Sequence, residues 1–161
     1  MNISIRRMSA DDVPAVSRLM SSCYLFLAKE EGFSDCELEQ LLDTRCSAQY
    51  VRESSRRFDR YVGELDERIV GVVAVQESDV AELWVLPERH REGLGTALFQ
   101  KGEQLIADAG HRILTVRTTG YAAPFYEAMG AHVVGRKRCD RGPLKGRDLT
   151  YLEKRLLGLS D

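Results

Sequence analysis

The stretch Val85-Leu86-Pro87-Glu88-Arg89-His90-Arg91-Glu92-Gly93-Leu94-Gly95-Thr96-Ala97-Leu98 decides the fold of this chain. It contains the end of an apolar strand, a charged loop, two glycines spaced G-x-G and the start of a helix. The first N–H groups of a helix have no partner inside it, and the helix dipole adds positive charge there, so the junction favours a phosphate or pyrophosphate. Glycine lets an anion approach the backbone closely. A simple turn of the chain would show the same G-x-G pair.

Length and composition indicate one globular domain over residues 1–161. Of the 161 residues, 43% are hydrophobic and 30% charged, a balance typical of proteins that bury a core of their own. No apolar run reaches the roughly 20 residues that span a bilayer. The N-terminus MNISIRRMSADD has no apolar segment of the kind a secretory signal needs. We therefore expect a cytoplasmic protein with no membrane partner.

The cysteines point to free thiols rather than to a metal site. Cys23, Cys36, Cys46 and Cys139 show neither C-x-x-C pairing nor a histidine at zinc spacing. We expect buried or half-buried free thiols and no bound metal.

Charge is distributed unevenly along the chain. Residues 1–80 hold 15 acidic and 10 basic residues, a net charge of −5, whereas residues 81–161 hold 10 and 13, a net charge of +3. A basic half around an anionic cofactor and an acidic half beside a cationic substrate would have this pattern. An ordinary solvated surface would have it too.

Hydrophobic periodicity predicts strands and helices along the whole chain. Glycines at 32, 110 and 130 follow apolar stripes with helical spacing and predict where helices end. The expected strands cover residues 3–6, 60–64, 69–75, 81–85, 113–117, 131–137 and 148–156. The expected helices cover residues 9–31, 34–51 with a break near 44–47, 94–109 and 121–129.

The connections between these elements predict the fold class. Short turns join the strands between residues 60 and 85, which makes them an antiparallel meander. The long helix after Gly93 separates the fourth strand from the fifth, so these two should run parallel. Ser34 and Glu37 form the S-x-x-E pattern of a capping box before the second helix. The order of elements is typical of an α+β fold.

Two separated motifs stand in this order of elements. Leu83-Trp84-Val85-x-Pro87-Glu88 is followed by His90-x-x-Gly93-x-Gly95, and further on comes Pro124-Phe125-Tyr126-Glu127-Ala128-Met129-Gly130-Ala131. Together they resemble the acyl-CoA signature Q/R-x-x-G-x-G/A and the F-Y-x-x-x-G-F block of the GNAT superfamily of acetyl-CoA-dependent N-acetyltransferases. Three positions depart from the family pattern: His90 for Gln or Arg, Thr119 for Asn and Ala131 for Phe. The resemblance covers nearly the whole chain in element order.

The resemblance implies a GNAT fold, with a mixed central sheet of about seven strands, helices on both faces and a splay between the fourth and fifth strands. It implies acetyl-CoA as co-substrate, with the pantetheine arm beside the fourth strand and the pyrophosphate on the loop before the long helix. The cofactor-binding residues that it implies are Leu83, Val85, His90, Arg91, Glu92, Gly93, Leu94, Gly95, Thr96 and Thr119.

Acetyl transfer to an amine needs a neutral amine, a donor for the developing oxyanion and a proton for the departing thiolate. The resemblance implies Tyr126 as the proton donor and a fourth-strand N–H near Val85 as the oxyanion donor. Glu82 is the leading candidate for the base. Tyr126 packed only as a core ring and Glu82 facing solvent are the structural alternatives. Other carboxylates that could act as the base are Glu77, Asp79, Glu30 and Glu31.

Aromatic and imidazole side chains near these motifs have ordinary structural explanations. We expect His90 to flank the phosphate loop and His132 to lie on a strand. Trp84 alternates with apolar neighbours, which favours packing on the sheet over stacking on a substrate.

The acceptor is left open between a small-molecule amine and a protein amine. Residues 136–147 contain six basic residues and one acidic residue, which is compatible with a solvated loop or with a site for an anionic acceptor. A pI of 6.0 argues against nucleic-acid binding. Leu98 and the preceding meander argue against a dinucleotide G-x-G-x-x-G site. A catalytically silent acyl-CoA-binding sensor or regulatory module is the alternative function, and the resemblance also allows a homodimer.

Overall fold

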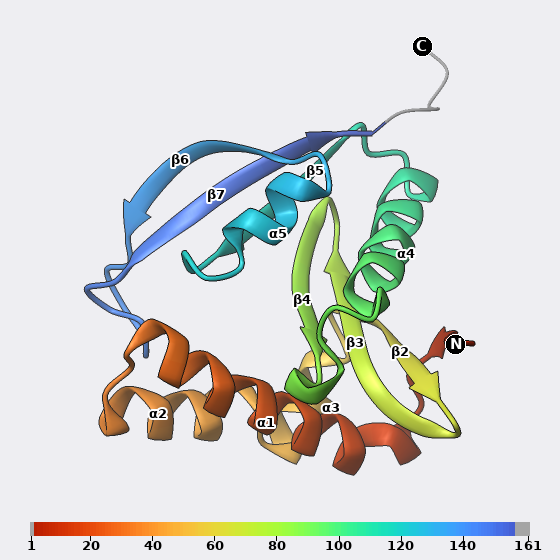
Figure 1. The fold of residues 1–161 in the computed structure, drawn as a ribbon, viewed down its shortest axis with the longest axis horizontal. Helices are drawn as coiled ribbons and strands as arrows, with labels where there is room; N and C mark the ends of the chain where they lie inside the picture. Colours follow the sequence, from red (N-terminus) through yellow and green to blue (C-terminus); the bar gives the residue numbers. More distant parts are fainter. Residues whose placement is uncertain (1, 157–161) are drawn as a thin grey trace.

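A mixed sheet of seven strands runs through the computed structural model, which describes residues 2–156 (Figure 1). Its strand order is β1-β2-β3-β4-β5-β7-β6, and neighbours are antiparallel except for the parallel pair β4 and β5. The predicted α+β class and the parallel pair are therefore confirmed. Residue 1 and residues 157–161 of the expected domain lie outside the described residues.

The elements follow one another as the periodicity predicted, with bounds shifted by a few residues. In chain order they are β1 (Ser4–Arg7), η1 (Ala10–Asp12), α1 (Val13–Glu31), α2 (Asp35–Arg45), α3 (Ala48–Ser54), β2 (Asp59–Leu65), β3 (Arg68–Gln76), β4 (Asp79–Val85), η2 (Pro87–Arg89), α4 (Leu94–Asp108), β5 (Ile113–Thr118), α5 (Ala123–Ala128), β6 (His132–Arg138) and β7 (Asp148–Arg155).

Capping residues start the helices of the first half. Ser9 precedes a short 3₁₀ turn, η1, and α1 begins only after it. The Ser34 hydroxyl accepts the Glu37 N–H at 3.0 Å, and the Glu37 carboxylate accepts the Ser34 N–H at 2.9 Å, so the predicted capping box is present. The break expected near residues 44–47 separates α2 from α3, whose N-cap is Ser47.

Helices cover both faces of the sheet, as predicted (Figure 1). On one face, α1, α2 and α3 pack against a cluster that includes Val62, Val72 and Trp84. On the other face, α4 and α5 pack against Val73 and Val75. Successive side chains of a strand point to opposite faces, so β3 contributes to both clusters and is buried throughout residues 70–75.

Arg147 fastens the loop between β6 and β7 to the turn between α1 and α2. Its guanidinium donates to both carboxylate oxygens of Glu37, at 2.6 and 2.8 Å. It also donates to the carbonyl oxygens of Glu31 and Gly32, at 3.2 and 3.0 Å, and lies 4.6 Å from the centre of the Phe33 ring. The tip of the hairpin therefore reaches the end of α1, as Figure 1 shows.

The Arg147–Glu37 contact makes stability depend on pH in a defined direction. Hydrogen bonds from the Arg147 side chain and the Ser34 N–H lower the pKa of Glu37 from 4.5 to about 2. A carboxylate whose pKa is lowered by folding contributes stability that is complete above pH 4.5 and is lost as the pH falls toward 2. We expect Glu37→Gln to be less stable than wild type at pH 7, and the difference in urea-unfolding free energy to shrink steadily below pH 4.5.

Glu39→Gln is the matched control, because Glu39 lies on an exposed part of the same helix. It should show no pH-dependent difference of this kind. If the difference in unfolding free energy between Glu37→Gln and wild type stayed constant from pH 7 to pH 3, the stabilising role of the ionised Glu37 carboxylate beside Arg147 would be contradicted.

Candidate active site

The strands β4 and β5 part after one point of contact. Asp79, the first residue of β4, is paired with Thr115 of β5, and this is the one residue pair that joins the two strands within residues 2–156. The Thr115 N–H donates to the Ser78 carbonyl at 2.9 Å, and its hydroxyl donates to Asp79 at 3.0 Å. The predicted splay is present, and these contacts hold its closed end.

The edge of β4 that faces the splay has peptide groups without a neighbouring strand. The Leu86 N–H donates to the Val70 carbonyl of β3 at 2.9 Å. In an antiparallel pair, alternate residues direct their N–H and C=O groups at the same neighbour. Leu83 and Val85 therefore direct theirs away from β3 and into the splay, where an extended ligand could pair with them.

The Val85 carbonyl on this edge is already occupied. His90 Nε2 lies 3.0 Å from it, so this ring nitrogen carries the donated proton, and the Cys23 thiol lies 3.4 Å away. The Val85 N–H remains directed into the splay. His90 thus joins the loop before α4 to the end of β4, in agreement with a flanking rather than a catalytic position.

The parted strands open into a cavity of about 580 Å³. Of the predicted cofactor residues, those that line it are Leu83, Val85, His90, Arg91, Gly93, Gly95, Thr96 and Thr119. Glu92 and Leu94 do not line it. Leu94 packs its side chain in a separate cluster with Leu65 and Val70, so only its backbone could serve the site.

The N-terminus of α4 leaves its first amides free for a ligand. Gly93, the N-cap, has a φ of 83°, and no side chain caps the helix. The first helical N–H with a backbone acceptor is that of Ala97, which donates to the Gly93 carbonyl at 3.1 Å. No atom lies within 4 Å of the position that a Cβ at Gly93 would occupy. The N–H groups of residues 93–96 therefore have no acceptor within the helix, and Gly93, Gly95 and Thr96 line the cavity, an arrangement typical of phosphate binding at helix ends.

Gly95 lies against the Phe125 ring as well as beside the cavity. A Cβ there would lie 3.2 Å from Phe125 Cε1, closer than ordinary van der Waals contact. The second glycine of the motif thus lets α5 approach α4, which places Phe125 and Tyr126 at the cavity wall.

Tyr126 is a core ring that also borders the cavity. It is buried, and its ring contacts Phe99 and Phe125 at centroid distances of 5.8 and 5.2 Å. Burial raises the pKa of the Tyr126 hydroxyl above its usual value of 10, with a smaller contribution from Asp79. The hydroxyl therefore stays protonated near neutral pH and can donate a hydrogen bond into the cavity.

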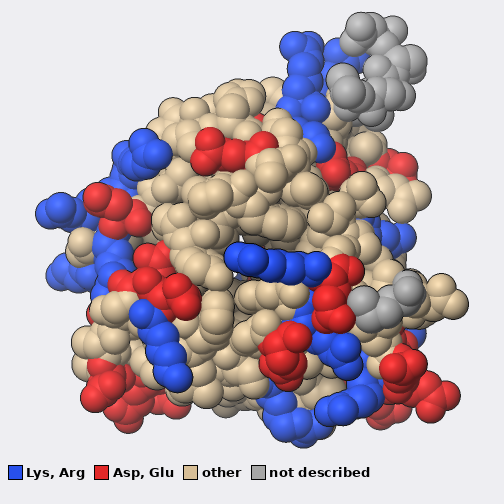
Figure 2. Space-filling view, in the orientation of Figure 1, with Lys and Arg blue, Asp and Glu red and all other residues tan. Residues whose placement is uncertain are grey.

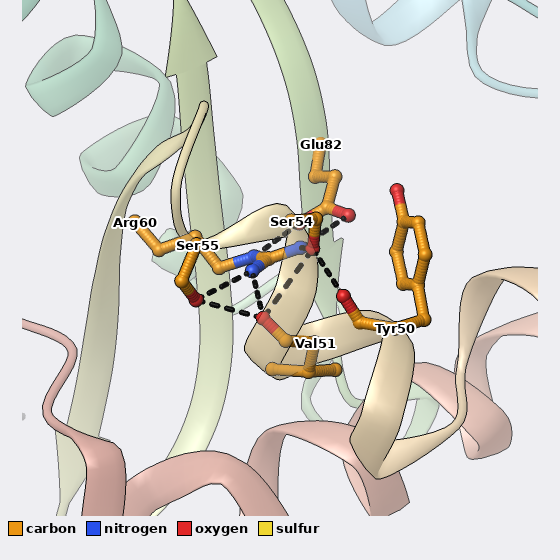
Figure 3. Close-up of polar contacts among 6 residues, drawn as sticks. All are labelled: Tyr50, Val51, Ser54, Ser55, Arg60 and Glu82. Carbon is orange, nitrogen blue, oxygen red and sulfur yellow. Dashed lines mark hydrogen bonds and ion pairs between the residues drawn. The ribbon is translucent and has the colours of Figure 1, made fainter.

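Glu82 is buried and paired rather than facing solvent (Figure 3). Its two carboxylate oxygens accept hydrogen bonds from Arg60 Nε and Nη2 at 2.8 and 3.1 Å. Only 1% of the Arg60 side chain and 7% of the Glu82 side chain are exposed. Glu82 lines the cavity and lies two residues from Trp84 on the same face of β4. Trp84 packs against Tyr24 at 4.6 Å and also reaches the cavity.

The other candidate carboxylates lie outside this cavity lining. Asp79 is bound by Thr115 at the closed end of the splay, where burial raises its pKa. Glu31 accepts the Tyr121 N–H at 2.6 Å and borders a second hollow, beside β6 and β7. Glu77 lies in the turn before β4, and Glu30 is exposed on α1.

Sequence patterns missed the contribution of α1 to the cavity. Phe26, which lies off the predicted apolar stripe, contacts the rings of His90 and Tyr121 at 5.2 and 5.7 Å. Helical periodicity identifies a face that packs on a sheet, and Phe26 instead spans the two sides of the splay. Among the cavity residues that had not been predicted are Cys23, Phe26, Leu27, Arg89, Arg117 and Tyr121.

Charged side chains of both signs lie around the site. Figure 2 shows a hollow near the centre of this face, acidic side chains at the lower left over α2, and basic side chains along the left edge over β6. Arg89, Arg91 and Arg117 line the cavity itself. A cavity with these cations and free helix amides suits an anionic ligand.

Residues 2–156 include no helix that is both long and apolar enough to cross a membrane. Within the same residues, no group of three or more His, Cys, Asp or Glu side chains is positioned to hold a metal ion. All four cysteines are free thiols.

A protein-family match identifies the family to which this chain belongs. The family model of the acetyltransferase (GNAT) domain matches residues 28–144, well over half of the chain. The chain belongs to the GNAT acetyltransferase family. As a GNAT domain, it is an acetyl-CoA-dependent acetyltransferase.

Solved structures of GNAT acetyltransferases share its fold. The chain is similar to a GCN5-related N-acetyltransferase from Rhodopseudomonas palustris, with 18% identity, 97% of each chain covered and a TM-score of 0.86. It is similar to the PaiA N-acetyltransferase from Thermoplasma acidophilum in complex with coenzyme A, with 18% identity, 96% of this chain and 99% of that chain covered and a TM-score of 0.77. It is also similar to the ribosomal-protein-S18-alanine N-acetyltransferase from Escherichia coli, with 15% identity, 99% and 97% coverage and a TM-score of 0.72.

Proposed function

We propose that this GNAT domain transfers the acetyl group of acetyl-CoA directly to an amine of a small molecule or protein while both substrates are bound. The proposal rests on one observation: the uncapped amides at the start of α4 and the unpaired edge of β4 line the same cavity. The first suits a pyrophosphate, and the second suits the amide-containing pantetheine arm. The free thiols support a reducing compartment, and we propose a cytoplasmic location for the domain.

The pyrophosphate would lie on the N–H groups of residues 93–96, with Arg89 and Arg91 beside it. The pantetheine arm would run along Leu83 and Val85 into the splay. Its thioester would then lie between the Val85 N–H, which is placed to stabilise an oxyanion, and the Tyr126 hydroxyl. Thr119, at the end of β5, borders the opposite wall.

Gly93→Ala and Gly110→Ala form a matched pair that tests this cofactor site. Both glycines have positive φ, 83° and 95°, and at neither does any atom lie within 4 Å of the position that an added Cβ would occupy, so each substitution should cost about 1–2 kcal/mol of stability. Only Gly93 borders the cavity, and strain there would turn the first amides of α4 away from the ligand. We expect Gly93→Ala to weaken acetyl-CoA binding about tenfold, or about 1.4 kcal/mol, by calorimetry.

Gly110→Ala, at the far end of α4, should bind acetyl-CoA as wild type does. Equal affinities in the two variants would refute the placement of the pyrophosphate.

Direct transfer fits the cysteine chemistry of the site. Cys23 borders the cavity, but burial raises the pKa of its thiol to about 12. Burial likewise raises the pKa of the Cys46 thiol to about 12. A thiol with so high a pKa supplies almost no thiolate near neutral pH, so an acetyl-cysteine intermediate at either position is disfavoured. The acceptor nitrogen would instead attack the thioester carbon, and the carbon–sulfur bond would break to release coenzyme A.

Two side chains would handle the protons. Tyr126 would give its hydroxyl proton to the departing thiolate, in keeping with its buried, protonated state. Glu82 would take the proton that the acceptor ammonium must lose before or during attack. Each of its oxygens accepts one hydrogen bond from Arg60 and retains a further lone pair.

Tyr126→Phe keeps the ring in the Phe99–Phe125 cluster and removes only the hydroxyl. We expect kcat to fall about 10²–10⁴-fold while the Kd of acetyl-CoA stays within twofold, measured by a thiol-release assay and calorimetry. Tyr61→Phe, on β2 and outside the cavity lining, controls for the loss of a phenol.

An undiminished kcat in Tyr126→Phe would remove Tyr126 from the chemistry. A wild-type protein that binds acetyl-CoA but acetylates no member of a panel of amines, polyamines, amino acids, aminoglycosides and peptide N-termini would instead indicate the silent acyl-CoA-binding alternative.

A further inference from the structure

We propose that Arg60 is the positioning residue for the base Glu82 and that Ala74 provides the gap through which the two side chains meet. The inference rests on the proposed role of Glu82 as the base. Neither β2 nor α3 lines the cavity. The proposal nevertheless gives both elements a part in the reaction of the acceptor, because they hold the residue that orients Glu82.

The register of the sheet brings the pair together. Ala74 of β3 is paired with Arg60 of β2 on one side and with Glu82 of β4 on the other. Residues in register on neighbouring strands project from the same face. Arg60 and Glu82 are therefore two strands apart, about 10 Å, with only the Ala74 methyl group between them. Their long side chains meet, as the close-up in Figure 3 shows, and the strand register places Ala74 between the two residues.

The guanidinium of Arg60 is saturated. Nε and Nη2 donate to the two oxygens of Glu82, and Nη2 also donates to the Ser54 hydroxyl at 2.6 Å. Nη1 donates to the Val51 carbonyl at 2.9 Å and to the Ser55 hydroxyl at 3.1 Å. These are five bonds for the five N–H groups of an arginine. Arg60 is thus fixed by the end of α3 (Figure 3) and has no donor left for a substrate.

Because all the N–H groups of Arg60 are used, the acceptor meets Glu82 and not Arg60 in the cavity. The planar, two-point contact fixes the plane of the Glu82 carboxylate, which a single-point cation could not do. The Tyr50 and Phe58 rings, at 5.9 and 5.3 Å from the guanidinium carbon, leave Arg60 little room to move. Glu82 is then the member of the pair that lines the cavity, and it is held for the incoming ammonium group.

A purely structural role is the competing explanation, because Arg60 also ties α3 to the sheet. The two roles differ in their kinetic consequences. A structural tie affects unfolding alone, whereas a positioning contact lowers kcat/KM for the acceptor and leaves acetyl-CoA binding unchanged.

Arg60→Lys and Ala74→Val separate these roles. Lysine keeps the positive charge but cannot make the two-point contact of a guanidinium with a carboxylate. Valine at position 74 adds bulk between Arg60 and Glu82 and leaves the hydrogen bonds from Arg60 to α3 in place. In both variants we expect kcat/KM for the acceptor to fall about 10–100-fold, since displacement of a reacting group by about 1 Å costs on this order. The Kd of acetyl-CoA should stay within twofold.

Arg6→Lys is the matched control, because Arg6 also bonds to carboxylates, those of Asp12 and Glu64, but neither of these lines the cavity as Glu82 does. Arg6→Lys should lower the thermal midpoint and leave kcat/KM for the acceptor unchanged.

A double-mutant cycle with Glu82→Gln completes the test. If Arg60 acts through Glu82, Arg60→Lys should change the remaining activity of Glu82→Gln by less than twofold. An equal loss on both backgrounds overturns the proposal. A lower thermal midpoint with unchanged kinetics in both Arg60→Lys and Ala74→Val also overturns it. Full activity in Glu82→Gln would show that the base assignment has failed, and the positioning role with it; an impaired Glu82→Gln beside a normal Arg60→Lys would refute the positioning role alone.

Discussion

Asp79 and Thr115 hold β4 to β5 at one point, and the rest of the structure accommodates the separation of the two strands beyond it. A sheet that opens in its middle leaves backbone groups of β4 without a strand to pair with, and such groups are costly unless water or a ligand meets them. Each half of the sheet therefore needs support of its own. On one side, α1 to α3 and α4 sandwich the meander, and on the other side α5 packs against β6 and β7.

Contacts between residues far apart in the sequence span the opening, among them the hydrogen bond from the Tyr121 N–H to Glu31. Arg147 ties the β6–β7 loop to the end of α1, and Phe26 contacts rings on both sides of the splay. Without such contacts, the two halves would be joined chiefly at Asp79 and along the chain itself. The cavity is thus a consequence of sheet topology that long-range contacts keep in shape.

The parts of this structure that could be predicted from the sequence depend on neighbours within a few residues. The Ser34–Glu37 capping box spans one turn, and the helix stop at Gly32 and the G-x-G junction are also local. The parallel pairing of β4 and β5 followed from the helix between them. Resemblance to a family supplied the splay, which no local pattern encodes.

The features that could not be predicted depend on register and tertiary packing. Arg60 is an ordinary basic residue at the start of a strand, and Glu82 lies 22 positions later; only the pairing of both with Ala74 brings them together. A charged residue on a strand usually faces solvent, so the burial of Glu82 could not be predicted from the sequence. Gly95 could be read as access for an anion, whereas its contact with Phe125 required the placement of α5.

The Arg60–Glu82 pair also has an energetic meaning. Burying two charges is expensive, and a buried ion pair often adds little to stability compared with apolar packing. Removing one partner is far more damaging, because the other is left as an uncompensated buried charge. Such a pair beside a cavity is therefore better explained by what it holds in place than by stability, and here it holds a carboxylate that lines the cavity.

Backbone amide shifts during titration of the protein with coenzyme A test the central claim most directly, since they report on each N–H separately. If the splay and the start of α4 form the cofactor site, the largest changes in the ¹⁵N–¹H spectrum should fall on Leu83, Val85 and residues 93–96, with small changes in β1 and α2. Changes confined to the second hollow beside β6 and β7, or no saturable change at all, would contradict the account.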